Sequence, residues 1–408
     1  MRKGWQTKKL GDVCATIQDG AHESPQRQFD SPGKGRFLYI TSKNIRNNCL
    51  DLGNVSYVEA DFHSRIYPRC KPSIGDVLLT KDGANTGNVT LNTLDEPFSL
   101  LSSICLIKTK PDSLSPGFLS YYIQSPDGLK SITGQMTGAA IKRIILRDIK
   151  LAPIPIPPLP EQQRIVAILD EAFEGLATAT ANAEQNLRNA RALFESHLQS
   201  VFTQRGKGWV EKMLGDVCEF ENGDRGKNYL HRSEYVESGI PWINTGHIQQ
   251  DGTLSETEMN FISRGKYESL RSGKIQPGDL VYCLRGATLG KTALVDPYTI
   301  GAVASSLVIL RPSSVLDSRY LYFFLTSPIG QGLIKGYENG AAQPNLGAKS
   351  VAKYLIALLP IAEQKQLVAK LDDLRGETKR LQSVYQQKLA AVNELKKSLL
   401  HQAFSGAL

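Results

Sequence analysis

The sequence predicts an α+β protein made of two pseudo-symmetric modules, each with a mixed or mainly antiparallel sheet and short helices, and two long helices that form an antiparallel coiled coil. Three observations lead to this prediction. An internal repeat runs through the 408 residues, short apolar segments lack regular βαβ alternation, and each repeat ends in a long helical pattern. The expected limits are 1–158 for the first module, 159–204 for the central helix, 205–360 for the second module and 361–408 for the C-terminal helix.

The repeat is visible at the start of each half, where Leu10–Cys14 recurs as Leu214–Cys218 at an offset of 204. Further matched pairs follow in the same order as Gly75–Leu78 with Gly278–Val281, Glu161–Gln162 with Glu363–Gln364, and Phe202 with Phe404. The offset falls only to 202 along the half, so chance resemblance is excluded and the chain is an internal duplication. The segments between the anchors differ widely, as a comparison of 19–37 with 222–240 shows.

Each module contains the same succession of predicted elements. Apolar runs next to glycine predict strands at 76–80 and 104–108, with counterparts in the second half. The aromatic-rich segment 118–124 ends at Ser-Pro, as does its counterpart 320–326, and each is expected to form a short buried helix. Because strands and helices do not alternate regularly, we expect a mainly antiparallel, curved sheet in each module.

The long helices are predicted from apolar residues spaced by three and four. The first follows the proline-rich segment Ala152–Pro160, which we expect to be a stiff connector. Residues expected in the coiled-coil seam are Ile165, Leu169, Leu176 and Leu187 in the first helix, and Leu367, Leu371, Leu381 and Val392 in the second. At 1.5 Å per residue each helix spans roughly 60–70 Å, too long to be covered by one small module. We therefore expect the helices to pair with each other; the alternative is that each packs on its own module.

Composition limits the class of protein. The net charge is +8, and the excess lies mainly in residues 1–150, which carry +6; such a surface suits a phosphate-bearing partner. The sequence has no apolar run long enough for a membrane span and its start does not resemble a signal peptide, so we expect a cytoplasmic protein without a membrane partner. The six cysteines form no C-x-x-C pair and the six histidines complete no metal set, so free thiols and no metal site are expected.

The closest approach to a catalytic motif is Arg285–Thr292, which resembles a phosphate-binding loop but has arginine where the first glycine belongs. The matching stretch 82–88 lacks the Lys-Ser/Thr pair, so a two-glycine turn between strands is the better interpretation. No cofactor loop of a methyltransferase, acidic cluster of a nuclease or Ser/His/Asp set is present. The sequence therefore predicts no catalytic residues and no cofactor.

Polar turns at equivalent places of the two halves carry the candidate DNA-binding residues, because their amide and cationic donors suit base edges and phosphates. In the first half these are Gln18, His22, Arg27, Lys43, Asn44, Lys81, Asn85, Thr86, Lys142 and Arg143. In the second half they are Asn222, Arg225, Lys227, Asn228, Tyr229, Asn244, His247, Arg285, Thr288, Lys291, Gln343 and Asn345. The alternative for each is an ordinary residue of a solvated loop.

Three motifs resemble the specificity subunit of type I restriction-modification enzymes. They are Leu159–Val166, which opens the central helix, Leu399–Gly406 near the end of the chain, and Trp-x-x-x-x-Leu-Gly-Asp-Val, which opens both halves. The resemblance covers the whole chain. The first half departs from the family pattern, since it lacks the Arg-Gly-Lys-Asn-Tyr turn of the second and has Ile141–Arg143 where the second has Gln343–Asn345.

The resemblance implies two target recognition domains on double-stranded DNA, each recognising one part of a bipartite site, with the coiled coil setting the spacer. It implies two methyltransferase subunits docked on the helices, restriction subunits as further candidate partners, and catalysis carried by those partners. The competing hypothesis is a coiled-coil scaffold that binds only proteins. The divergence of the loops between the halves favours the DNA-recognition hypothesis, because a scaffold would not need it.

Overall fold

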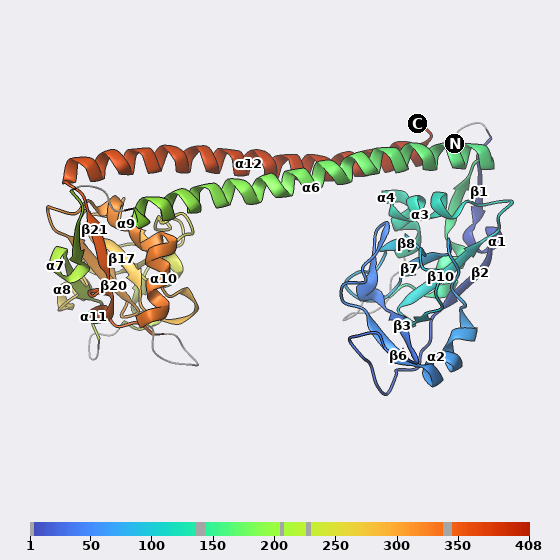
Figure 1. Ribbon diagram of the computed structural model, residues 1–408, viewed down its shortest axis with the longest axis horizontal. Coiled ribbons are helices and arrows are strands. Elements are labelled where there is room, and N and C mark those ends of the chain that lie inside the picture. Colours follow the sequence, from blue (N-terminus) through green and yellow to red (C-terminus); the bar gives the residue numbers. More distant parts are fainter. Residues whose placement is uncertain (1–3, 135–142, 205–207, 226–229, 338–344) are drawn as a thin grey trace. The chain divides into compact units, whose positions relative to one another are not determined.

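The computed structural model describes residues 4–134, 143–204, 208–225, 230–337 and 345–408 (Figure 1). The chain divides into two compact units. The first comprises Met1–Glu184 and Gln387–Leu408, and the second comprises Gln185–Gln386. Each unit therefore contains one globular module together with part of both long helices.

The described part of unit 1 contains a four-stranded main sheet, a three-stranded second sheet and two two-stranded sheets. The main sheet has the order β2-β10-β7-β8 and is antiparallel throughout, with β2 Cys14–Asp19, β10 Ile104–Thr109, β7 Val77–Thr80 and β8 Val89–Leu91. The second sheet has the order β6-β3-β9, with β6 Ser56–Glu59, β3 Arg36–Ile40 and β9 Ser99–Leu100, and its β3–β9 pair is parallel. Further strands and α-helices of the module are β4 Ile45–Arg46, β5 Cys49–Leu50, α1 Leu10–Val13, α2 Ala60–Ile66, α3 Pro116–Gln124, α4 Pro126–Thr133 and α5 Leu146–Leu151.

The module of unit 2 has the same main sheet in the order β13-β20-β17-β18, with β13 Cys218–Asn222, β20 Leu307–Pro312, β17 Leu280–Cys283 and β18 Thr292–Leu294. Its second sheet has the order β14-β16-β15-β19, with β14 Tyr235–Val236, β16 Asn260–Ile262, β15 Ile240–Ile243 and β19 Ala302–Val303. Its helices are α7 Leu214–Val217, α8 Arg264–Ser269, α9 Ser318–Thr326, α10 Pro328–Tyr337 and α11 Ala348–Val351. The predicted α+β class with mixed sheets is confirmed, and the duplication extends to strand order.

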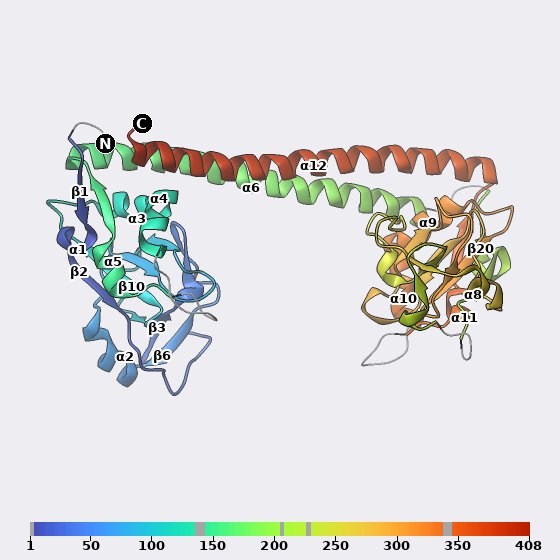
Figure 2. The same cartoon turned by 180° about the vertical axis from the view of Figure 1, so that it is seen from behind.

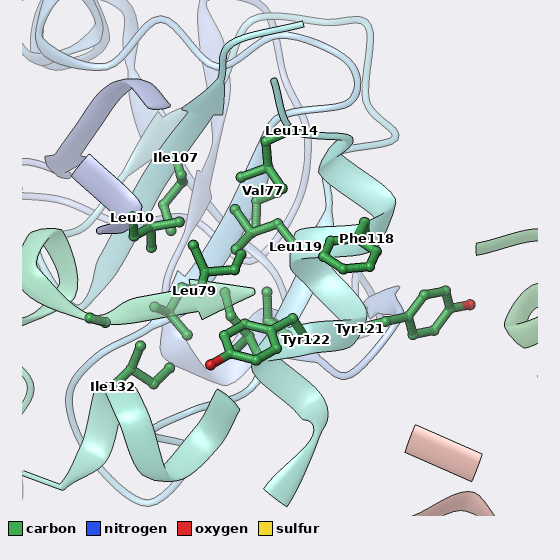
Figure 3. Close-up of a cluster of buried hydrophobic side chains, with 14 of the residues drawn as sticks. Leu10, Val77, Leu79, Ile107, Leu114, Phe118, Leu119, Tyr121, Tyr122 and Ile132 are labelled. Carbon is green, nitrogen blue, oxygen red and sulfur yellow. The ribbon is translucent and has the colours of Figure 1, made fainter. Parts of the chain in front are cut away.

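One core of unit 1 lies between the main sheet and α3 (Figure 3), and two further clusters include residues of β3. Val77 and Leu79 on β7 and Ile107 on β10 are fully buried against Leu119 of α3. Figure 3 shows Tyr121 pointing away from these side chains. In both views α3 lies on the side of the module nearer to the long helices, as α9 does in unit 2 (Figure 2). The aromatic segments predicted as buried helices are therefore the elements that meet the long helices.

The proline-rich segment is more than the connector predicted from the sequence. Its residues Pro153–Ile156 form β11, which pairs antiparallel with β1, Gln6–Lys9. The alternation places Ile154 and Ile156 in the core, while proline occupies the intervening positions of this two-stranded edge. In unit 2, β21 Leu355–Leu358 pairs in the same way with β12 Val210–Met213.

The two long helices are α6, Leu159–Thr203, and α12, Ile361–Ser405. In unit 1 the N-terminal half of α6 shares a core with the C-terminal end of α12, and in unit 2 the C-terminal end of α6 shares a core with the N-terminal part of α12. This pairing is the predicted antiparallel one. None of the described helices has a stretch both long and apolar enough to cross a bilayer.

Part of the burial along the predicted seam comes from the modules. Of the predicted seam residues, Ile165, Leu169 and Leu371 are buried, Leu176, Leu187, Leu367 and Val392 are half-buried, and Leu381 is exposed. The buried ones belong to the cores that contain α3 and α9. Each helix thus packs along the other helix, as predicted, and packs on the modules as well.

Candidate nucleic-acid interface

A cleft of about 560 Å³ in unit 2 gathers four of the predicted DNA-binding residues. Asn222 and Arg225 line it where β13 ends, Arg285 lines it where the strand β17 passes into a turn, and Asn345 faces the turn through an antiparallel bridge with Arg285. All four are exposed. In the major groove an asparagine amide donates to N7 and accepts from the N6 amino group of adenine, and a guanidinium group donates to O6 and N7 of guanine.

Glycine backbone geometry shapes this cleft. A Cβ added at Gly223 would lie 2.4 Å from the carbonyl oxygen of Val303, so only glycine allows β13 to turn so close to β19. On the other side, Gly286 and Gly290 have φ of +77° and +82°, which turns the chain between β17 and β18. The turn is followed by a strand, whereas a phosphate-binding loop would open a helix, and this confirms the prediction of a two-glycine turn.

Two further cations line the cleft that the sequence did not single out, Arg271 and Lys349. Arg271 is oriented by the buried carboxylate of Asp224, which accepts from its backbone N–H at 2.8 Å and from Nη2 at 3.2 Å. Arg225 donates through Nη2 to the carbonyl oxygen of Ser305 at 3.2 Å. Arg285 is exposed and has no carboxylate partner among the residues that the structure describes. The cleft therefore presents four cations against one buried acid, which favours an anionic ligand.

Unit 1 has the equivalent frame but a different polar set. Asp82 occupies the position of Arg285 and pairs with Arg143, whose Nε donates to Oδ1 at 3.0 Å.

Lys81 of unit 1 is buried, and its Nζ lies 3.2 Å from Oδ2 of the buried Asp19. His22 lies on the exposed side of this pair, with Nε2 at 3.5 Å from the same oxygen. Because its ammonium is already paired inside the module, Lys81 is removed from the set of candidate contacts, while the exposed Arg143 and His22 remain.

Two other predicted residues also have internal roles. Asn44 is fully buried, accepts from the backbone N–H of Thr41 at 3.0 Å and donates to the carbonyl oxygen of Asp51 at 3.0 Å. His247 is buried and its Nδ1 accepts from the N–H of Asn244 at 3.1 Å, while burial lowers the pKa of its imidazole. Both side chains close a short turn, so neither is free to contact DNA in this conformation.

Four predicted residues are half-buried and lie in turns or in short 3-10 turns. Asn85 donates to the carbonyl oxygen of Ser42 at 3.0 Å, and Thr86 donates to that of Gly83 at 2.6 Å. Asn244 accepts from the N–H of Gly246 at 2.8 Å. Thr288 lies with Oγ1 at 3.4 Å from Sγ of Cys283.

The remaining predicted residues either take no part in the turns described above or lie outside the described residues. Gln18 is half-buried on β2, while Arg27, Lys43 and Lys291 are exposed, and Lys43 donates to the hydroxyl of Ser56 at 3.1 Å. The predicted residues Lys142, Lys227, Asn228, Tyr229 and Gln343 lie outside the described residues. The structure thus brings together a subset in unit 2 and distributes the others over both modules.

Five of the six cysteines are buried, and Cys49 is exposed. No group of three or more His, Cys, Asp or Glu among the described residues could hold a metal ion. All six cysteines are free, and burial raises the pKa of Cys14 and of Cys218 to about 12. Cys14 and Cys218 are therefore neutral, and a neutral buried thiol is a poor nucleophile.

The fold is that of a duplicated chain with two equivalent modules and two long helices. Residues 2–187 and 206–389 match the family model described as type I restriction modification DNA specificity domain, once in each half. The chain belongs to this family, so the resemblance predicted from its motifs is confirmed.

Curated relatives support the assignment along most of the chain. The type I restriction enzyme EcoKI specificity subunit of Escherichia coli (strain K12) is 22% identical over 427 residues, covering 100% of this chain and 89% of that protein. The EcoBI specificity subunit of Escherichia coli is 22% identical over 358 residues, covering 82% and 73%.

Two solved structures share the fold. One, described as the structural basis of complex assembly and conformational transition of the type I R-M system, has a TM-score of 0.78 at 21% identity and covers 100% of this chain and 99% of that chain. The HsdS subunit from Thermoanaerobacter tengcongensis has a TM-score of 0.60 at 21% identity and covers 100% and 98%.

Proposed function

We propose that this chain is the DNA-recognition subunit of a type I restriction-modification enzyme and that each module recognises one part of a bipartite DNA site. The observation that carries the proposal is the cleft of unit 2, where Asn222, Arg225, Arg285 and Asn345 converge beside two further cations. Single polar residues in loops occur on any protein, but side chains from four distant segments converge here on one opening.

The chemistry of the cleft separates base contacts from phosphate contacts. Arg285 and Arg225 have guanidinium groups suited to O6 and N7 of guanine, and Asn222 and Asn345 have amides suited to N6 and N7 of adenine. Arg271 is held by Asp224, and Lys349 lies at the N-terminal part of α11. These two suit phosphate oxygens, which position the protein on the duplex without selecting a sequence.

The two modules would recognise different bases, because equivalent positions carry different chemistry. Asp82, whose carboxylate pairs with Arg143, stands in unit 1 where Arg285 stands in unit 2, so this position of unit 1 lacks the guanidinium that would donate to guanine. An asymmetric bipartite site follows from a shared frame with different turns.

The long helices would set the number of base pairs between the two parts of the site. α6 is one continuous helix of 45 residues, which corresponds to about 68 Å. Two methyltransferase subunits would dock on the helices, and restriction subunits are further partners of the proposed complex. Methylation and cleavage, with their cofactors, would belong to these partners.

The test uses the chain assembled with its methyltransferase subunit and measures DNA binding and the methylated sites of a host genome. We expect Arg285→Ala to weaken binding of the cognate site by about 5- to 150-fold, equivalent to the 1–3 kcal/mol of one paired base contact, and to relax one base position in a single half-site. The matched control is Arg264→Ala, because Arg264 is an exposed arginine of the same unit on α8 that pairs with Glu268 at 3.1 Å.

Two results would overturn the proposal. If the wild-type complex bound random and cognate-bearing DNA equally, the chain would be a scaffold that binds only proteins. If Arg285→Ala and Arg264→Ala weakened binding equally on all sequences, the cleft would contribute charge without base recognition.

A further inference from the structure

A buried amide lies at the start of each long helix. Gln162, in the first turns of α6, is fully buried. Its Oε1 accepts from the backbone N–H of Ser115 at 2.8 Å, and its Nε2 donates to the carbonyl oxygens of Ser113 at 3.0 Å and Pro157 at 2.9 Å. The side chain thus joins three segments: the loop before α3, the end of β11 and the helix itself.

The second unit repeats the arrangement with different neighbours. Gln364 of α12 is fully buried, its Oε1 accepts from the N–H of Asp317 at 2.9 Å, and its Nε2 donates to the carbonyl oxygens of Val315 at 2.9 Å and Leu359 at 2.7 Å. The glutamine belongs to the Glu-Gln pair that marks the repeat in the sequence, although the residues around it differ. The duplication has therefore kept the contact together with the residue.

The amide is not needed to begin the helix. The first free N–H groups of α6 are already satisfied, since Glu161 and Gln162 both donate to the carbonyl oxygen of Pro158, at 2.9 Å and 3.1 Å. The carbonyl oxygen of Pro360 accepts from the backbone N–H groups of Glu363 and Gln364 in the same way. Burying an amide is costly unless its bonds are made, and here the partners are backbone groups whose positions follow from the module itself. The side-chain amide therefore attaches the helix to the module and does not serve as a helix cap.

A second polar contact lies eight positions further along each helix. In unit 1 the hydroxyl of Tyr121 on α3 donates to Asp170 at 2.5 Å, and in unit 2 Nη2 of Arg319 on α9 donates to Asp372 at 2.5 Å. Eight helical residues correspond to about 12 Å. Two attachment points at this separation define a direction, whereas one point would leave the helix able to swing. Apolar packing alone is not directional, but hydrogen bonds are.

We propose that Gln162 and Gln364 are positioning residues that fix the direction in which each long helix leaves its module, and that they thereby confine DNA binding to one spacer length. This inference rests on the proposed function, because the spacer has meaning only if both modules bind one DNA molecule. Loss of either amide would leave base recognition within each module intact and would widen the range of accepted spacers.

The experiment measures binding of the methyltransferase complex to DNA that carries both cognate half-sites at the natural spacer or at spacers one and two base pairs longer or shorter. Gln162→Met keeps the length of the side chain and removes its hydrogen bonds, as does Gln364→Met. Matched controls are Gln163→Met and Gln366→Met, since these glutamines are exposed on the same helices. We expect the preference for the natural spacer over its neighbours to fall by about tenfold or more in the two buried variants, and to stay unchanged in the controls.

A milder variant guards against loss of folding. Tyr121→Phe removes only the hydroxyl that contacts Asp170 and keeps the aromatic ring that packs against Phe173, with centroids 5.3 Å apart. It should lower the spacer preference in the same direction while the order of preference among half-site sequences stays that of the wild type.

The outcomes separate the two proposals. If Gln162→Met and Tyr121→Phe lower thermal stability but keep the wild-type spacer preference, the amides serve only stability and the inference is wrong. If the wild-type complex shows no preference for the half-sites, the proposed function itself fails.

Discussion

Replacing Phe404 by alanine tests whether the last turns of α12 are part of the core of unit 1. Phe404 is buried, and its ring packs edge-on against Phe118 at a centroid distance of 5.1 Å and against Tyr122 at 5.3 Å. Both neighbours belong to α3. The contact therefore joins the end of the chain to the module that begins it.

The size of the effect follows from the buried ring. Truncation of a buried phenylalanine costs about 3–5 kcal/mol, from the lost transfer free energy and the cavity left behind. Because Phe404 lies next to the end of α12, the last helical turn can adjust, and we expect the lower end of this range, about 3 kcal/mol. That value corresponds to roughly a hundredfold change in an equilibrium constant.

Hydrogen exchange of the full-length chain measures the loss in each unit separately. Core amides of β10 in unit 1 should exchange about a hundredfold faster in Phe404→Ala if they exchange through unfolding of that unit. Those of β20 in unit 2 should keep their rates. Gln402→Ala, at an exposed position of the same helix, is the control and should stay within about 0.5 kcal/mol of the wild type. A change below about 1 kcal/mol in β10, or equal acceleration in both units, would show that the reasoning about this contact is wrong.

Two further predictions concern buried polar groups of unit 1. Lys81→Met leaves the carboxylate of Asp19 buried without its ammonium partner, so it should lower the free energy of unfolding, measured by urea denaturation, by about 3–5 kcal/mol. Adding Asp19→Asn should recover part of this loss. If the losses of the two single variants were instead additive in the double variant, the pairing would be contradicted. Burial lowers the pKa of His63, so the unfolded chain binds the proton first and the free energy of unfolding should decline as the pH falls below about 6.5. His63→Gln should make this decline shallower between pH 7.5 and 5.5, and an unchanged pH dependence would rule out His63 as its source.

At the candidate site, local sequence patterns point to some of the residues and miss others. The sequence points to Arg285 as a candidate because it stands in a glycine turn whose counterpart, residues 82–88, contains no arginine. Arg271 carries no comparable signal, since the carboxylate that orients it belongs to Asp224, 47 positions earlier in the chain. Asn44 and Lys81 are polar residues of the kind expected in an exposed binding site, yet their polar atoms bind partners inside the module. A polar residue in a turn has the same local pattern whether it contacts a ligand or its own backbone.

The duplication, the α+β class and the two long helices were determined by the sequence alone, because each depends on a regular pattern: the shared order of anchors, the apolar strands next to glycine, and the spacing of three and four along α6 and α12. Only the tertiary structure decided how the helices are buried and which side chains converge. The ends of α6 and α12 enter the cores of the modules, and the cleft of unit 2 draws on segments near Asn222, Arg271, Arg285 and Asn345. The physical reason is that burial and convergence depend on contacts between residues far apart in the chain, which no local periodicity specifies.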